Sequence, residues 1–221
     1  WSNPKINPEG KVIEVVGKDE GVDIDVITIA REYNLPMKFS KKTMEEAKSI
    51  LDEIPEEEIA KREDFRSENV FTIDPDDAKD FDDALSIEKF ENGNYEIGIH
   101  IADVSHYVKQ DSSLDKEALE RGNSVYLVGG VIPMLPEELS NGICSLVPYK
   151  DRLTYSVVVE MSPRGKVLNY RIVKTVINSK RRFTYDDAQK VIETGAGDLA
   201  AEITTLNKIA VTLRAKRMKS G

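Results

Sequence analysis

The sequence concentrates carboxylate side chains in one short segment. Six of the ten residues from 74 to 83 are Asp, and Lys79 is the one cation among them. Charges of one sign at this density repel each other and lower stability unless a cation lies among them. The short Asp side chain holds its oxygens close to the backbone, and hard divalent cations prefer oxygen ligands in a fixed geometry. The segment therefore predicts a Mg²⁺ or Mn²⁺ site, which we expect to hold a pair of ions.

The neighbours of the acidic segment support a built site rather than a solvated acidic turn, which stays the alternative. Residues 70–73 and 84–87 are apolar and are predicted to be core strands, so they pin both ends of the segment. A calcium loop of the EF-hand type does not fit, because Ala78 stands at the third ligand position and no Gly follows it. A zinc hydrolase does not fit either, because His100 and His106 are the only two histidines and lie apart.

Two metal ions held by Asp side chains suit the attack of water on a phosphodiester. One ion activates the water and the other stabilises the leaving oxygen, at a separation of about 4 Å. The acidic segment thus favours a nuclease, a phosphatase or a polymerase-like site, and by itself it does not choose among them.

Composition limits the class of protein. The chain has 221 residues, of which 40% are hydrophobic and 32% charged, as in globular proteins. No apolar run is long enough to span a bilayer, and residues 1–11 carry no secretory pattern. Cys144 is the single cysteine, which excludes an internal disulfide and a Cys-rich zinc site. We therefore expect a cytoplasmic protein that is not attached to a membrane.

The net charge of −9 is divided unevenly along the chain. Residues 162–221 carry 13 Lys and Arg against 5 Asp and Glu, whereas residues 1–161 carry 18 against 35. Because phosphate binding depends on local potential, the acidic total does not exclude a nucleic-acid partner. A solvated basic helix is the simpler interpretation of the asymmetry.

Periodicity and turn residues predict an α+β fold with a mixed, mostly antiparallel sheet packed with helices. Hairpins are expected at Asn92-Gly93 and at Pro163-Arg164-Gly165, and a capping box at residues 43–46 predicts a helix running to about Ile54. Residues 52–64 are strongly acidic and contain a proline, which predicts a linker or a solvated helix. The other expected strands are 12–16, 70–73, 84–90, 95–101, 153–161 and 167–177, and the other expected helices are 23–33, 113–121, 184–193 and 198–219.

Three further features of the sequence have a structural or functional interpretation. His100 is expected on the polar face of a strand, opposite its apolar neighbours, and Cys144 is expected in the core. Lys180-Arg181-Arg182 fits either a contact to RNA backbone or a solvated turn. The chain begins at Trp1 without an initiator Met, so we expect it to be a piece of a longer protein.

Five segments in register resemble the RNB catalytic domain of the ribonuclease II / ribonuclease R exoribonucleases, and the style of the hairpins resembles bacterial ribonuclease R more than ribonuclease II. The segments are Phe71-Thr72-Ile73-Asp74-Pro75, Asp80-Phe81-Asp82-Asp83-Ala84, residues 100–108, residues 133–140 and Cys144-Ser145-Leu146. The resemblance covers about residues 60–221. It implies that residues 1–17 end a cold-shock or OB-type β-barrel, that residues 18–62 form a connecting helical region, and that residues 63–221 are the N-terminal half of the catalytic domain.

The resemblance also implies a function and its residues. The implied activity is hydrolytic, 3′-to-5′ removal of nucleoside 5′-monophosphates from single-stranded RNA with Mg²⁺, for which Mn²⁺ can substitute. Asp76 and Asp77 fall outside the family's pattern, and Tyr126 corresponds to a tyrosine that packs against the 3′-terminal nucleotide. The family's catalytic and metal-binding aspartates correspond to Asp74, Asp80, Asp82 and Asp83.

The chain also departs from the family. The RNB domain of the family is longer than the part present in this chain. In the family, the missing half carries an arginine that stabilises charge in the transition state and a second aromatic clamp. This chain is therefore expected to be weak, inactive or poorly folded by itself, as part of a monomeric parent without a small-molecule cofactor. A non-catalytic RNA-binding or regulatory module is the second hypothesis, although a decayed copy would have no reason to keep all four aspartates. A two-metal phosphatase acting on small substrates is the third.

Overall fold

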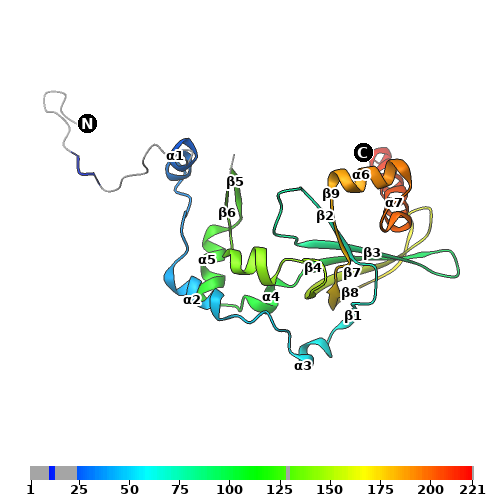
Figure 1. Cartoon of the computed structure of the whole chain (residues 1–221), viewed down its shortest axis with the longest axis horizontal. Coiled ribbons are helices and arrows are strands. Elements are labelled where there is room, and N and C mark those ends of the chain that lie inside the picture. The colour runs from blue at the N-terminus through cyan, green and yellow to red at the C-terminus, as the bar shows by residue number, and fades with distance from the viewer. Residues whose placement is uncertain (1–9, 13–23, 128–129, 221) are drawn as a thin grey trace.

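Two hairpins and the pairing between them form the centre of the main sheet (Figure 1). β3 (Asp83–Lys89) and β4 (Tyr95–Ala102) pair antiparallel across a turn in which Gly93 has a φ of 84°, where a residue with a side chain would be strained. β7 (Asp151–Met161) pairs antiparallel with β8 (Val167–Asn178) and, on its other side, with β4. Both predicted hairpins are confirmed.

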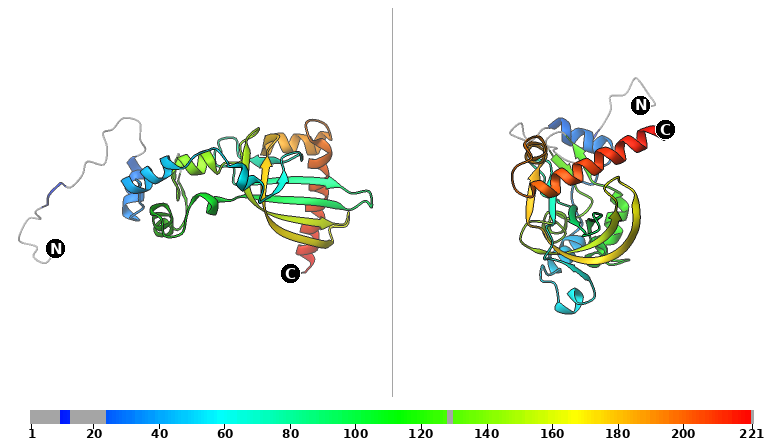
Figure 2. Two further views of the ribbon diagram at one scale, coloured as in Figure 1. Left: turned by 90° about the horizontal axis from the view of Figure 1, so that it is seen from below. Right: turned by 90° about the vertical axis from the view of Figure 1, so that its right-hand side faces the viewer.

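Three short strands complete a seven-stranded sheet in the order β1-β8-β7-β4-β3-β2-β9. They are β1 (Glu63–Phe65), β2 (Phe71–Asp74) and β9 (Arg181–Thr184). β1 pairs in parallel with β8, and β9 pairs in parallel with β2. The other four pairs, β8–β7, β7–β4, β4–β3 and β3–β2, are antiparallel. The sheet is therefore mixed and mostly antiparallel, as the sequence predicts, and Figure 2 shows that it is strongly curved.

Two helices cover one side of the sheet after β9. Thr184 opens α6 (Tyr185–Thr194), the helix expected at 184–193, with a capping box: its hydroxyl accepts from the backbone amide of Asp187, while the Asp187 carboxylate accepts from the backbone amide of Thr184. α7 (Ala200–Lys219) then lies across the outer face of the sheet, where Ile209 packs in the cluster of Ile97, Val159 and Met161. These two helices fix the position of β9 beside β2.

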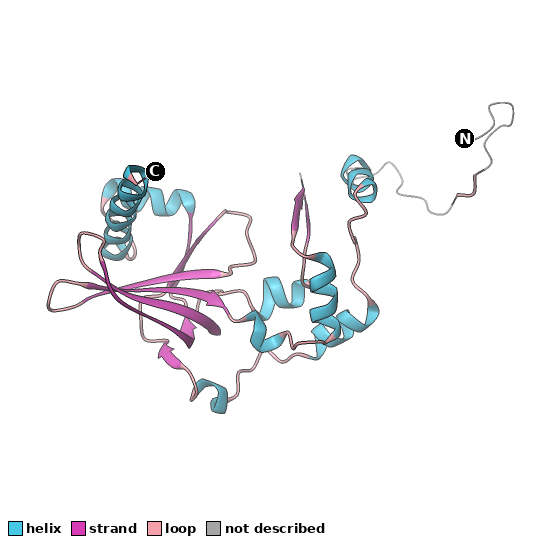
Figure 3. Cartoon of the chain, turned by 180° about the vertical axis from the view of Figure 1, so that it is seen from behind, coloured by secondary structure: helices cyan, strands magenta, loops and turns pink. Residues whose placement is uncertain are grey.

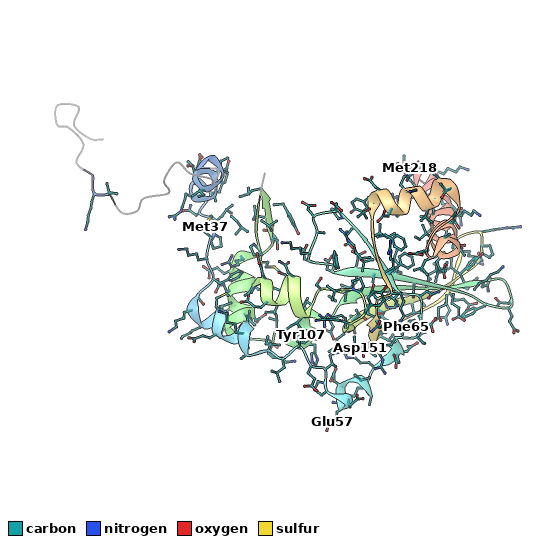
Figure 4. The ribbon with its side chains drawn as sticks, viewed as in Figure 1. Met37, Glu57, Phe65, Tyr107, Asp151 and Met218 are labelled. Atoms are coloured by element: carbon teal, nitrogen blue, oxygen red, sulfur yellow. The ribbon has the colours of Figure 1, made fainter. Side chains whose placement is uncertain are left out.

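Of the remaining elements, the short helix at residues 56–59 lies near β1, and the other helices and a small hairpin lie at the other end of the molecule (Figures 1 and 3). Apolar side chains of some of them, such as Ala47, Leu114 and Leu139, pack with the inner face of the sheet around Phe65, which Figure 4 labels. These elements are α1 (Ile24–Glu32), α2 (Lys41–Ser49), α3 (Glu56–Ile59), α4 (Val104–Tyr107), α5 (Ser113–Arg121), the hairpin of β5 (Val125–Leu127) and β6 (Gly130–Ile132), and the π-helical turn η1 (Glu138–Ile143).

The computed structural model describes residues 10–12, 24–127 and 130–220. The strand predicted for 12–16 lies outside this part except for Val12, which forms no strand there. None of the helices within these limits is both long enough and apolar enough to cross a membrane.

One local prediction is wrong and another is incomplete. α2 begins at Lys41 and ends at Ser49, because Ser40 rather than Thr43 is the N-cap and accepts a hydrogen bond from the Thr43 amide. The acidic stretch 52–64 contains α3, which has no buried residue and so fits the predicted solvated helix, but it also contains the start of β1, which was not predicted.

His100 lies on the strand face opposite its apolar neighbours, as expected, but that face is enclosed. The sheet curves around it, so the His100 side chain is fully buried. Its ring nitrogens lie 3.0 Å from Ser86 Oγ and 2.7 Å from Ser156 Oγ. Cys144 is buried, as predicted.

Candidate active site

The acidic segment connects two neighbouring antiparallel strands. Asp74 is the last residue of β2 and Asp83 the first residue of β3, so both lie at the same end of the sheet. Residues 75–82 between them form a connection that we call the aspartate loop. In Figures 1 and 3 this loop faces the β5–β6 hairpin.

The aspartate loop and the hairpin enclose a cavity of about 450 Å³. Tyr126 of β5 reaches it and donates a hydrogen bond of 3.3 Å from its Oη to Asp80 Oδ2. Tyr185, the first residue of α6, lines the cavity from the side of β9. The lining residues are Ile73, Asp74, Pro75, Asp77, Ala78, Asp80, Asp82, Asp83, Tyr126, Val131 and Tyr185. The structure thus brings together all four aspartates and the tyrosine that the sequence singles out.

Asp74 carries the clearest electrostatic anomaly of the cavity. Its side chain is buried, with 7% of the residue exposed, and its Oδ2 has no hydrogen-bond partner. Burial raises the pKa of Asp74, and the charges of Asp83 and Asp82 raise it further, against the effects of the Thr72 hydroxyl and the Arg182 charge. An ionised carboxylate in this position is destabilised unless a cation approaches it.

Asp83 is exposed to solvent on one side but lies in the concave wall of the cavity. Partial desolvation there raises the pKa of Asp83, and the nearby charge of Asp82 adds to the effect. For both residues, loss of the proton places a negative charge in a partly desolvated site that already holds other negative charges. The site therefore favours positively charged ligands.

The ring of Tyr126 remains open to a ligand. The residue is 69% exposed although its hydroxyl is held by Asp80. The Asp80 charge and, less strongly, burial raise the pKa of the Tyr126 phenol, which therefore stays protonated and keeps the ring in place. An exposed aromatic face beside a row of carboxylates is suited to stacking on a nucleobase.

The donor chemistry of the site fits a hard divalent cation, since every candidate ligand is a carboxylate oxygen and one of them is buried without a partner. The ligands are not preassembled. Within the described ranges, no group of three or more His, Cys, Asp or Glu side chains stands close enough to hold a metal ion. Histidine and thiolate ligands play no part, because burial keeps His100 enclosed and raises the pKa of the Cys144 thiol to about 12.

Sequence reasoning missed Tyr185 and left Arg182 undecided. Arg181 and Arg182 lie in β9 rather than in a solvated turn, and Arg182 donates to the carbonyls of Pro75 and Asp76. An aromatic residue directly after the Thr184 cap was the available pattern for Tyr185. Its place at the cavity depends on the parallel pairing of β9 with β2, which no local pattern reveals.

The RNB domain family matches residues 62–221. The chain belongs to the RNB-domain family. A cold shock domain family matches residues 1–40, which agrees with the expected OB-type tail at the start of the chain. The domain boundaries after residues 17 and 62 stay predictions.

Two curated relatives of this RNB chain are ribonuclease R proteins. The chain is 50% identical to Ribonuclease R 1 of Lactococcus lactis over 193 residues. This aligned stretch covers 87% of the chain and 23% of the relative. The chain is 47% identical to Ribonuclease R of Thermotoga maritima over 195 residues, and this stretch covers 87% of the chain and 28% of that relative. The RNB chain thus spans about a quarter of the length of these proteins.

Solved structures share the fold of the RNB chain. Mycoplasma genitalium RNase R in complex with ribose methylated single-stranded RNA matches 94% of the chain and 33% of its own length, with a TM-score of 0.86 and 28% identity. Yeast Ssd1, described as a pseudonuclease, matches 92% of the chain and 26% of its own length, with a TM-score of 0.77 and 21% identity. The second match shows the fold alone.

Proposed function

We propose that this RNB chain is part of a hydrolytic 3′-to-5′ exoribonuclease that releases nucleoside 5′-monophosphates from single-stranded RNA with Mg²⁺, for which Mn²⁺ can substitute. The proposed ligands of the cation are Asp74, Asp80, Asp82 and Asp83. A reducing, cytoplasmic location and a monomeric parent protein without a small-molecule cofactor remain part of this proposal.

One observation carries the proposal. The four aspartates that match the family's pattern come from the end of β2, the aspartate loop and the start of β3, and they line a single cavity with Tyr126. Asp76, which lies outside the pattern, has a side chain that is 95% exposed and does not line this cavity. Asp77, the other acid outside the pattern, does line the cavity, so its carboxylate lies near the four proposed ligands without being assigned to the cation.

Each residue has a definite task in the proposed reaction. Tyr126 stacks on the terminal base and orients the last phosphodiester toward the carboxylates. Asp74 and Asp83, whose pKa values are raised by burial and further by neighbouring negative charge, accept a cation in place of a proton. The bound Mg²⁺ would supply activation of the attacking water and stabilisation of the leaving oxygen. The cavity wall keeps the reacting phosphate within reach of all four carboxylates.

A cleavage assay tests the proposal. We would incubate 5′-labelled single-stranded RNA and Mg²⁺ with the chain, its D82N variant and the control variant D76N. We expect a ladder that shortens stepwise from the 3′ end with the unchanged chain and D76N, and none with D82N. Internal cuts or release of inorganic phosphate would instead contradict the exonuclease assignment.

Binding measurements decide the outcome if the chain does not cleave by itself. D82N should weaken Mn²⁺ binding while leaving RNA affinity in EDTA unchanged, because the amide removes a charge at the same size. RNA binding by a chain that binds no Mn²⁺ would favour the alternative, a non-catalytic RNA-binding module of the kind that a pseudonuclease fold allows.

A substitution of the stacking ring tests the RNA contact. Y126A should weaken RNA binding about 10- to 100-fold, because stacking on one base contributes on the order of 1–3 kcal/mol. Y126F keeps the ring and should bind RNA like the unchanged chain. Y149A removes a tyrosine that is 76% exposed elsewhere and serves as the control. Equal affinity of Y126A and Y149A would rule out the stacking role.

A further inference from the structure

Arg182 holds one end of the aspartate loop from the neighbouring strand. β9 runs parallel to β2, and this pairing places Arg182 directly beside Thr72. From there its Nη2 donates to the carbonyl oxygens of Pro75 and Asp76, at 2.9 Å for the latter. One guanidinium group thus binds the two residues that immediately follow the proposed ligand Asp74.

The same guanidinium group also reaches the other end of the loop. Its carbon lies 5.6 Å from the centre of the Phe81 ring, within the range of a cation–π contact. Its Nε is buried without a hydrogen-bond partner, so within the described part of the chain the hydrogen bonds of the group come from Nη2 alone. Its positive charge lies where the loop concentrates negative charge, and it lowers the pKa of Asp74 against the effect of burial.

Ser145 binds the aspartate loop at its second end, near Phe81. The residue is 1% exposed, and its Oγ donates to the carbonyl of Lys79 at 2.7 Å while accepting from the amide of Phe81 at 3.1 Å. The amide of Leu146 donates to the carbonyl of Phe81 at 2.8 Å. Three hydrogen bonds therefore fix the backbone on both sides of Asp80, from a segment that follows η1.

We propose that Arg182 and Ser145 are positioning residues that hold the aspartate loop from two sides and thereby direct Asp80 and Asp82 into the cavity. Phe81 is the pivot of this arrangement, since it is buried while the acids on either side of it line the cavity. The inference rests on the proposed function, because it assigns those acids to a cation. It also gives a role to the Cys144-Ser145-Leu146 motif.

The charge of the loop explains why it needs such a clamp. Without a cation the carboxylates repel each other, and a free loop would open and spread them into solvent. Holding the backbone in place before a ligand arrives lowers the cost of ordering the loop during binding. Loss of the clamp should therefore weaken cation binding without removing any ligand.

Variants of both residues test the clamp against a control in the same strand. S145A removes the central hydroxyl, R182Q removes the charge and the fork of donors, and R182K restores the charge alone. R181Q is the control, because Arg181 is adjacent in β9 but 46% of its side chain is exposed and it contacts Asp198 at 3.6 Å. D82N serves as the variant that removes a proposed ligand.

Two readouts are needed. Amide hydrogen exchange of residues 76–83 in EDTA reports the clamp directly, and we expect about tenfold faster exchange in S145A and R182Q, since lost hydrogen bonds contribute roughly 1 kcal/mol each. Mn²⁺ affinity, measured on the folded fraction, should fall about tenfold in the same variants. R182K should lie between R182Q and the unchanged chain, and R181Q should match the unchanged chain in both readouts.

The outcomes separate the clamp from the proposed function. Unchanged exchange of the loop in S145A and R182Q would overturn the clamp. Faster exchange with unchanged Mn²⁺ affinity, in a chain whose D82N variant loses Mn²⁺, would overturn the positioning role and leave the proposed function standing. An unchanged chain that binds no Mn²⁺, or a D82N variant that binds it normally, would refute the proposed cation site and with it the positioning role.

Discussion

Replacing Asp74 with Asn should stabilise the chain when no metal ion is present and should abolish cation binding. Asp74 is buried, and its Oδ2 has no hydrogen-bond partner. At neutral pH the Thr72 hydroxyl and the Arg182 charge compensate the Asp74 charge only in part in the folded state, whereas in the unfolded chain it is solvated. The amide of Asn carries no charge, and its NH₂ group can donate to Thr72 Oγ1, which is also buried without a partner.

The size of the effect follows from the burial of this one oxygen. Leaving a buried polar group unpaired costs about 1–3 kcal/mol. Because the amide still has to be desolvated, we expect D74N to recover about 1–2 kcal/mol of the free energy of unfolding. For a chain of this length that corresponds to a rise in the unfolding temperature of roughly 2–8 °C.

Calorimetry in EDTA at several pH values measures this prediction. The pKa of Asp74 is raised in the folded state, so protonation stabilises the fold, and this stability is lost as the pH rises through the raised pKa. The advantage of D74N should be largest at pH 8 and should disappear as the pH falls through that pKa. Addition of Mg²⁺ should raise the unfolding temperature of the unchanged chain but not that of D74N.

The control for this experiment is D76N, which removes a charge from the same loop. The Asp76 side chain is 95% exposed, and its ion pair with Arg182 at 3.9 Å is long and solvated, so it contributes little to stability. D76N should leave the unfolding temperature almost unchanged at every pH. A D74N variant that unfolds at a lower temperature than the unchanged chain at pH 8 in EDTA would refute the reasoning, since the Asp74 charge would then have a favourable partner.

Three further predictions concern the fold around the site. A Cβ at residue 98 would lie 2.4 Å from both His100 Nε2 and Ser86 Oγ, so G98A should lower the free energy of unfolding by about 1–3 kcal/mol in denaturant titrations. Burial lowers the pKa of His100 to about 4, so its contribution to stability is lost as the pH falls from its unfolded pKa near 6.5 toward 4; H100Q should flatten the pH dependence of the unfolding temperature in that window. Arg62 and Asp103 form a buried pair at 2.7 Å, so R62A should cost about 3–5 kcal/mol of unfolding free energy, whereas an unaltered denaturation midpoint would contradict this account of the pair.

Local features of the fold could be predicted from the sequence because their causes are local. The boundaries of α5 were predicted correctly, since Ser112 caps its start and Gly122 ends it with a φ of 76°. The hairpins followed from turn residues between alternating strands, and the capping box at Thr184 located the start of α6. For α2 the sequence pattern indicated Thr43 as the N-cap, whereas Ser40 caps the helix. The two residues could not be distinguished because Ser and Thr side chains accept the same kind of hydrogen bond.

Features that depend on distant parts of the chain could not be predicted. β1 and β9 are three and four residues long, and each pairs in parallel with a strand far away in the sequence. The enclosure of His100 depends on the curvature of the whole sheet. In the candidate site the density of aspartates predicted the acidic segment, and the family resemblance singled out four of them. Tyr185 reaches the cavity, and Arg182 reaches the aspartate loop, only through the pairing of β9 with β2.

The parallel pairing of β2 with β9 also sets the order of events during synthesis. Phe71 pairs with Arg181, so this contact has a large sequence separation and closes a long loop of chain. Residues 74–83 leave the ribosome well before β9 does, and chains are made from the N-terminus. Ser145 is made before β7 and β8, whereas Arg182 is made only after all the intervening strands, so the aspartate loop lacks its Arg182 contacts until then. The site matures at a late stage of folding, when the last strand of the sheet is added.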